Sequence, residues 1–202
     1  MKFISLLFFL FFTTLSFCTS FYRNNFNISI NANNQLRAEN ESCNIEALSE
    51  LLYHYFTANM YSKYKEDARK ARYINYRKTE CLENIKYLEN NTDSFDSKNR
   101  IKRYKRNLYV MNFLDIKTLR VLHPVEHVSI KMKSKTSYST YIAVLSEIKK
   151  NTNRIRHQVA KKLFSISYRK IIVNQKSKLM RQYLFVLKVL VPERIAEYPV
   201  RD

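Results

Sequence analysis

The chain has 202 residues, a formal net charge of +19 and a hydrophobic fraction of 46%, which is typical of a folded protein rather than a disordered one. It contains no glycine, so glycine-rich phosphate loops, the dinucleotide-binding turn and the G-x-S-x-G nucleophile elbow are excluded. Turns that need a positive φ angle are therefore expected to use Asn or Asp.

The positive charge is concentrated in the second half of the chain. Residues 21–99 contain 11 basic and 11 acidic residues, whereas residues 100–192 contain 22 basic and 3 acidic residues. A field of this kind favours an anionic partner, such as an anionic glycan or an acidic protein surface. The alternative is a solvated, lysine-rich surface that reflects coding bias.

Residues 1–20 have the three regions of a secretory signal peptide. Lys2 precedes the apolar run FISLLFFLFFTTLSF, and the small residues Cys18, Thr19 and Ser20 follow it. The run is shorter than the roughly 20 residues needed to span a bilayer. We therefore expect a secreted, extracellular protein with no transmembrane span after cleavage, and nucleic acid is not an expected partner.

Residues 21–42 are polar and rich in Asn, and we expect this segment to be disordered. The chain carries three N-x-Ser/Thr sequons, at Asn27, Asn40 and Asn90, all in predicted loops. In a secreted chain each of them is a candidate N-glycosylation site.

Cys43 and Cys81 are the two cysteines that remain after the leader is removed. An even pair in an oxidising route predicts a disulfide, which would contribute roughly 3–4 kcal/mol in the chain-entropy model. Two buried but unlinked thiols are the alternative.

Apolar residues recur every three or four positions through residues 44–88, which predicts one bent helix or two joined helices. The next segment, 100–122, is ambiguous between strand and helix. It opens with two overlapping Arg-x-Lys-Arg runs that end at Arg103 and Arg106 and resemble the recognition pattern of furin-type convertases. A precursor cleaved after either residue is one hypothesis, and a basic strand edge is the other.

His123 and His127 lie in an H-x-x-E-H sequence, the inverted zinc-peptidase pattern. Pro124 and the alternating continuation VSIKMK predict a strand instead, in which the two histidine Cα atoms would be about 13 Å apart and could not share a metal. We expect no metal, no cofactor and no catalytic residues.

The stretch from Val125 to Val191 is predicted to form four consecutive strands separated by short polar turns. The apolar positions change phase near Lys161 and Lys162, which predicts a bulge that bends the sheet. The sheet is also expected to carry an anion-binding face. Its candidate residues are Lys131, Lys133, Arg154, Arg156, Lys161, Lys162, Arg169 and Lys170.

Long amino-terminal helices followed by long, bent antiparallel strands resemble the α+β roll of the nuclear transport factor two-like superfamily. The resemblance covers roughly residues 43–192 and is one of element order. It implies an α+β fold in which helices pack on a bent antiparallel sheet of about four to five strands around a conical pocket, followed by a tail at 193–202. The expected function is a non-enzymatic binding protein, with a small-ligand carrier or an enzyme that uses the pocket as the alternative.

Overall fold

In the computed structural model the described residues are 25–57, 73–91, 94–124 and 127–200, so the predicted signal peptide lies outside them. These residues form an α+β fold, as the sequence predicts. The elements are β1 (Phe26–Ile30), β2 (Leu36–Ala38), β3 (Glu41–Cys43), α2 (Ile45–Thr57), β4 (Tyr73–Arg77), α3 (Lys78–Asn91), α4 (Phe95–Leu114), β5 (Thr118–Leu122), β6 (Val128–Lys133), α5 (Tyr138–Phe164), α6 (Tyr168–Val173), α7 (Lys178–Leu190) and β7 (Ile195–Val200).

The larger sheet is mixed, with the strand order β3-β2-β1-β6-β7. The hairpins of β1, β2 and β3 are antiparallel, whereas β6 runs parallel to both β1 and β7. The prediction of an antiparallel sheet was therefore wrong. So were the predictions of a disordered segment at 21–42 and a tail at 193–202, because strands on both sides of the sheet come from these segments.

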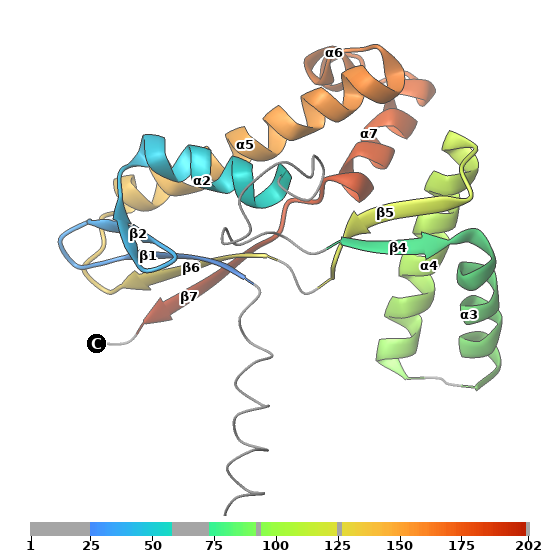
Figure 1. Cartoon of the computed structure of the whole chain (residues 1–202), viewed down its shortest axis with the longest axis horizontal. Helices are drawn as coiled ribbons and strands as arrows, with labels where there is room; N and C mark the ends of the chain where they lie inside the picture. Colours follow the sequence, from blue (N-terminus) through green and yellow to red (C-terminus); the bar gives the residue numbers. More distant parts are fainter. Residues whose placement is uncertain (1–24, 58–72, 92–93, 125–126, 201–202) are drawn as a thin grey trace, which may run out of the picture.

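Helices α2 and α5 lie side by side over one face of this sheet, and no described helix covers the other face (Figure 1). Between the sheet and the two helices lies a hydrophobic cluster in which Ile28, Leu48, Ile130 and Val144 are each 0% exposed. The alternating burial along β1 supplies one side of this cluster. Side chains thus fill the space in which a conical pocket was expected.

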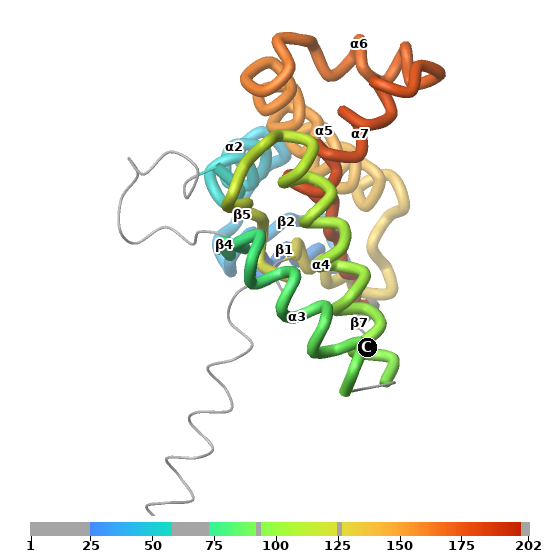
Figure 2. Tube along the Cα trace, turned by 90° about the vertical axis from the view of Figure 1, so that its right-hand side faces the viewer, coloured from blue at the N-terminus to red at the C-terminus, as the bar shows by residue number. Residues whose placement is uncertain are grey.

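The short sheet of β4 and β5 forms a second centre together with α3, α4 and α7 (Figure 2). Cys81, Val110, Met111 and Val186 are each 0% exposed in this second cluster. A third cluster joins α5, α6 and α7 through residues such as Ile171. Helix α5 therefore touches the first cluster with its amino-terminal half and the third with its carboxyl-terminal half.

Only the first of the four predicted strands is present, as β6. The next two segments form α5 and α6, and the last forms α7. The buried residues of α5 include Val144, Ile148, Ile155 and Val159, which are spaced by four or seven residues and so lie on one face of a helix. A helical pattern changes phase when it is interpreted with the two-residue period of a strand. The bulge predicted at Lys161–Lys162 was therefore wrong, because these residues belong to helix α5.

The segments on either side also differ from the sequence predictions. Residues 44–88 contain α2, strand β4 and most of α3 rather than one bent helix or two joined helices, with 58–72 outside the described residues. The segment 100–122, which was ambiguous between strand and helix, contains both: LYVMNF belongs to helix α4, and TLRVL is strand β5.

Serine and asparagine define the turns of this glycine-free chain. The side chains of Ser94, Ser137 and Ser167 accept hydrogen bonds at the starts of α4, α5 and α6. Within the described ranges, positive φ angles occur at Asn34, Glu39, Asn40, Asp115 and Ser165. The expectation that Asn or Asp would replace glycine is confirmed at three of these five positions.

Among the described residues the order of elements begins with strands and ends with a strand, and the longest helices lie in the middle and second half. The resemblance to the nuclear transport factor two-like superfamily depended on long helices preceding the strands, an order that the described elements do not follow. None of the described helices combines the length and the apolar composition required to cross a bilayer.

The packing between the sheet and α5 predicts the effect of a core substitution. Ile130→Ala should lower the free energy of unfolding by about 2–5 kcal/mol, because it removes a completely buried side chain at the centre of the sheet. Ile142→Ala on α5, where the side chain is 37% exposed, should cost less than about 1 kcal/mol. Urea unfolding followed by circular dichroism compares the two, and equal losses would contradict this packing.

Candidate functional site

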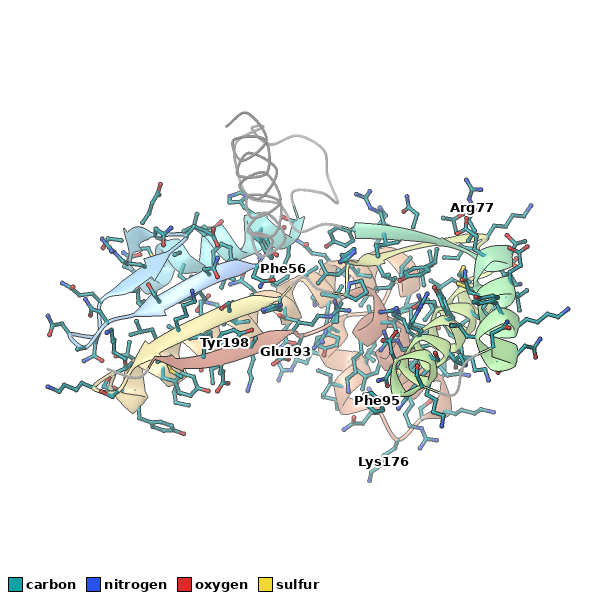
Figure 3. The ribbon with its side chains drawn as sticks, turned by 90° about the horizontal axis from the view of Figure 1, so that it is seen from below. Phe56, Arg77, Phe95, Lys176, Glu193 and Tyr198 are labelled. Atoms are coloured by element: carbon teal, nitrogen blue, oxygen red, sulfur yellow. The ribbon has the colours of Figure 1, made fainter. Side chains whose placement is uncertain are left out.

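A row of five residues crosses the helix-free face of the larger sheet, one residue from each strand. In register order they are Ser42, Arg37, Ser29, Lys131 and Tyr198. Paired residues of neighbouring strands point to the same face, and the residues that alternate with this row are buried under α2 and α5. Figure 3 looks onto this face, with Tyr198 labelled on β7.

The same face contains a shallow depression of about 530 Å³. Its lining combines three cationic side chains with hydroxyl and amide groups. The lining residues are Ser29, Ile30, Asn31, Gln35, Arg37, Ser42, Lys131, Met132 and Lys133. We call this set, together with Tyr198, the sheet-face site.

The loop between β1 and β2 is held in place by the side chain of Asn31. Its Oδ1 accepts hydrogen bonds from the backbone N–H groups of Asn33 at 3.0 Å and Gln35 at 2.9 Å. Its Nδ2 donates to Oε1 of Gln35 at 2.7 Å. Asn34, in the left-handed region with φ 62°, closes the turn, and its Oδ1 accepts from the backbone N–H of Ser137 at 2.7 Å. The amide side of the site is thereby fixed relative to α5.

Two of the three cations of the site, Arg37 and Lys131, are available to a ligand. Arg37 and Lys131 are exposed, and within the described part of the chain neither makes an ion pair. Tyr198 is 47% exposed and lies in register with Lys131. Guanidinium, ammonium, hydroxyl and amide groups beside an exposed aromatic ring can hold the sulfate or carboxylate groups and the ring face of an anionic sugar.

The predicted anion-binding residues do not share one face. Lys131 and Lys133 belong to the sheet-face site, whereas Arg154 lies on α5, with Nη1 3.6 Å from Oε1 of Glu50 and the guanidinium carbon 4.0 Å from the ring centre of Tyr53. The charge of Arg154 is therefore already paired within the fold.

Arg156 is not a surface residue, because only 6% of it is exposed. Its Nε donates to the backbone oxygen of Val191 at 3.0 Å, and its Nη1 donates to the hydroxyl of Tyr168 at 3.3 Å. The other four predicted residues, Lys161, Lys162, Arg169 and Lys170, are exposed at the end of α5 and on α6. A single basic sheet face built from all eight was a wrong prediction, because six of them lie on helices.

A second basic groove, of about 570 Å³, lies between α4 and α7. Four cations surround two aromatic rings, which meet edge to face with centroids 5.0 Å apart. The lining residues are Lys105, Arg106, Tyr109, Lys178, Arg181, Gln182 and Phe185. Lys105 is also paired with Glu89 at 2.7 Å.

Sequence reasoning missed the groove and half of the sheet-face site. Residues 178, 181, 182 and 185 have helical spacing, but this segment was assigned to a strand. Arg37 and Tyr198 were placed in a disordered segment and a tail, although the alternation in FNISI was a signal for the first strand.

Cys43 and Cys81 are both free thiols in the structure. Cys43 packs against the cluster under the larger sheet, whereas Cys81 is buried in the cluster of the second centre. The predicted disulfide between them is therefore not formed, and the two thiols belong to different cores. Burial, reinforced by the carboxylate of Glu80, raises the pKa of the Cys81 thiol to about 11.

Arg103 and Arg106, the predicted processing positions, lie within helix α4. Burial, together with the positive charge of Arg103, lowers the pKa of Arg106. Proteases bind extended segments, so cleavage after either arginine requires local unfolding of α4. One helical turn beyond Arg103, the amide of Asn107 is 1% exposed and makes no hydrogen bond to the described residues.

The three sequons differ in their surroundings. Asn40 is exposed in the turn between β2 and β3, and Asn90 is exposed at the end of α3. Asn27 is half-buried in the central region of the larger sheet, in strand β1 rather than in a loop. Its Nδ2 donates to the backbone oxygen of Asn25 at 3.1 Å.

No group of three or more His, Cys, Asp or Glu residues among those described could hold a metal ion. In the H-x-x-E-H sequence, residues 125 and 126 lie outside the described residues, and His127 immediately precedes strand β6. The groups that meet on the sheet face have the chemistry to hold anions, and the lining residues include no carboxylate.

The sequence matches no family model, and neither a curated protein nor a solved structure matches it.

The raised pKa of Cys81 predicts how stability depends on pH. Below pH 9, its ordinary pKa, the thiol is neutral in both the folded and unfolded states, so its contribution to stability is fully present. As the pH rises toward 11 only the unfolded state ionises, and stability falls. Urea unfolding at about pH 8 and about pH 10 should show this loss, and Cys81→Ala should reduce it. If Cys81→Ala lost as much stability between the two pH values as the wild type does, the loss would belong to other groups. One such group is Tyr73, whose pKa is raised to about 12 by burial.

Proposed function

We propose that the protein is a secreted, glycosylated, non-enzymatic binding protein that engages an anionic glycan through the sheet-face site. The observation that carries this proposal is the five-strand row in which Arg37 and Lys131 stand beside hydroxyl groups and the exposed ring of Tyr198. The secretory component rests on the sequence of residues 1–20.

The charge chemistry of the site favours sulfated or carboxylated sugars. Arg37 presents a planar guanidinium that can bind two oxygens at once, and Lys131 presents a compact ammonium two strands away. Serine hydroxyls and the Gln35 amide supply neutral hydrogen bonds between and beside them. Neutral sugars would leave the two cations without counter-charges, so the negative groups of the ligand should dominate its affinity.

Chromatography on immobilised heparin tests the proposal. The folded protein should elute above physiological salt, and the double variant Arg37→Ser/Lys131→Ser should elute at clearly lower salt, because the bound anions lose both partners. Tyr198→Ser should also weaken retention without changing the net charge. Lys86→Ser is the matched control, since Lys86 is an exposed lysine on α3 away from the sheet.

Elution of the wild-type protein below physiological salt would overturn the proposal. A second contradicting result would come from a control double variant of two exposed lysines elsewhere, Lys86→Ser/Lys117→Ser. If its eluting salt concentration fell as far as that of Arg37→Ser/Lys131→Ser, net charge alone would explain retention.

Glycan mapping of the secreted protein tests the secretory component. Asn40 and Asn90 should be modified, because both side chains are exposed on the described surface. Asn27 should be unmodified, because it is half-buried between β2 and β6, beside Ser129, which is 2% exposed. Enzymatic removal of N-glycans converts each modified Asn to Asp, which mass spectrometry detects. Absence of glycan at all three residues would contradict this component.

A further inference from the structure

The corner formed by α6, the turn after it and the first turns of α7 exposes apolar side chains to solvent. We call residues 168–181 the α6–α7 corner. Ile172 is 39% exposed, Val173 is 70% exposed and Leu179 is 44% exposed. Figures 1 and 2 place α6 at the top of the molecule, on the side opposite the open face of the sheet.

These apolar side chains lie among cations without counter-ions. The exposed basic residues of the corner are Arg169, Lys170, Lys176, Lys178 and Arg181, and none of them makes an ion pair with a described residue. The label of Lys176 in Figure 3 marks a side chain that extends away from the body of the protein. From Ile148 to Pro192 the sequence contains 12 Lys and Arg residues and no Asp or Glu. Helix α6 packs against α5 and α7 within this range, so its closest neighbours supply no carboxylate.

The fold holds this corner in place. Tyr168 and Ile171 anchor α6 in the third cluster, at 7% and 0% exposure. The buried guanidinium of Arg156 donates to the hydroxyl of Tyr168, and Asn174 Nδ2 donates to the backbone oxygen of Lys170 at 2.9 Å. The turn is closed by a hydrogen bond of 3.0 Å from the backbone N–H of Ser177 to the backbone oxygen of Asn174. The apolar side chains are therefore exposed by a well-packed helix pair rather than by incomplete packing.

We propose that the α6–α7 corner docks on the surface of an anionic phospholipid bilayer. Exposed aliphatic side chains at a projecting corner can enter the interface between headgroups and acyl chains, while the surrounding Lys and Arg side chains meet anionic headgroups. The groove between α4 and α7 shares Lys178 and Arg181 with the corner and continues the positive surface beside it. An acidic protein would satisfy the cations equally well, but a bilayer also accounts for Val173 at the most exposed position.

Co-sedimentation with phosphatidylcholine vesicles, with and without phosphatidylserine, tests the proposal. The full chain should bind the phosphatidylserine vesicles and not the pure phosphatidylcholine vesicles. Val173→Ser/Leu179→Ser should weaken binding about tenfold without changing the net charge, because interfacial affinity depends on buried apolar area. Lys176→Ser/Lys178→Ser should weaken binding by about 25-fold, since each cation near the surface contributes about fivefold. Leu82→Ser, on α3 and 54% exposed, is the matched control and should bind as the wild type does.

Three results would overturn the inference. The first is no binding to phosphatidylserine vesicles even at low salt. The second is equal binding by Val173→Ser/Leu179→Ser and the wild type, which would reduce the corner to a general polyanion surface. The third is a loss of vesicle binding in Leu82→Ser as large as that in Val173→Ser/Leu179→Ser. Heparin retention of Val173→Ser/Leu179→Ser should stay at the wild-type level, so failure of the bilayer inference and failure of the glycan proposal are distinguishable.

Discussion

The two-sided burial of helix α5 is the constraint on which the rest of the structure depends. Its first half packs Val144 and Ile148 against the larger sheet, and its second half packs Ile155 and Val159 against α6 and α7. A helix of 27 residues is about 40 Å long, so one element connects two hydrophobic clusters that otherwise share little. Arg156 reinforces the second junction, because its buried guanidinium joins α5 to α6 and to the end of α7.

The α+β class and strand β6 could be predicted from the sequence, but the connection between elements could not. Helices α5 and α7 are rich in β-branched and aromatic residues, which favour strands in a sequence-based prediction. Their helical spacing distinguishes a helix from a strand only when the packing partners on both sides are known. Strands β2, β3 and β7 were missed because β2 and β3 have only three residues each, and because β7 pairs with β6, which is distant in the sequence. Half of the sheet-face site was lost with them, since Arg37 and Tyr198 come from those strands, whereas Lys131 and Lys133 were identified because β6 was.

The charge asymmetry of the sequence has a different meaning in three dimensions. The second half carries the whole net charge of the chain, but two of its predicted anion-binding arginines make contacts within the fold. Arg154 lies over the ring of Tyr53 and beside Glu50. Arg156 donates a hydrogen bond to Tyr168 of the third cluster. Conversely, the neutral first half supplies Arg37 to the sheet-face site. Counts along the sequence therefore overestimate how many cations a ligand meets on one surface, and they assign some of them to the wrong surface.

The sheet-face site and the α6–α7 corner lie on opposite sides of the molecule, separated along the length of α5. Helix α5 is about 40 Å long, which is several times the screening length of about 8 Å at physiological ionic strength. Direct electrostatic coupling between the two surfaces is consequently negligible, and each responds to its own charges. The surfaces also differ in chemistry, because one pairs cations with hydroxyl, amide and tyrosine groups and the other pairs them with aliphatic side chains. A substitution that preserves charge can therefore separate their ligands, which a net-charge argument cannot do.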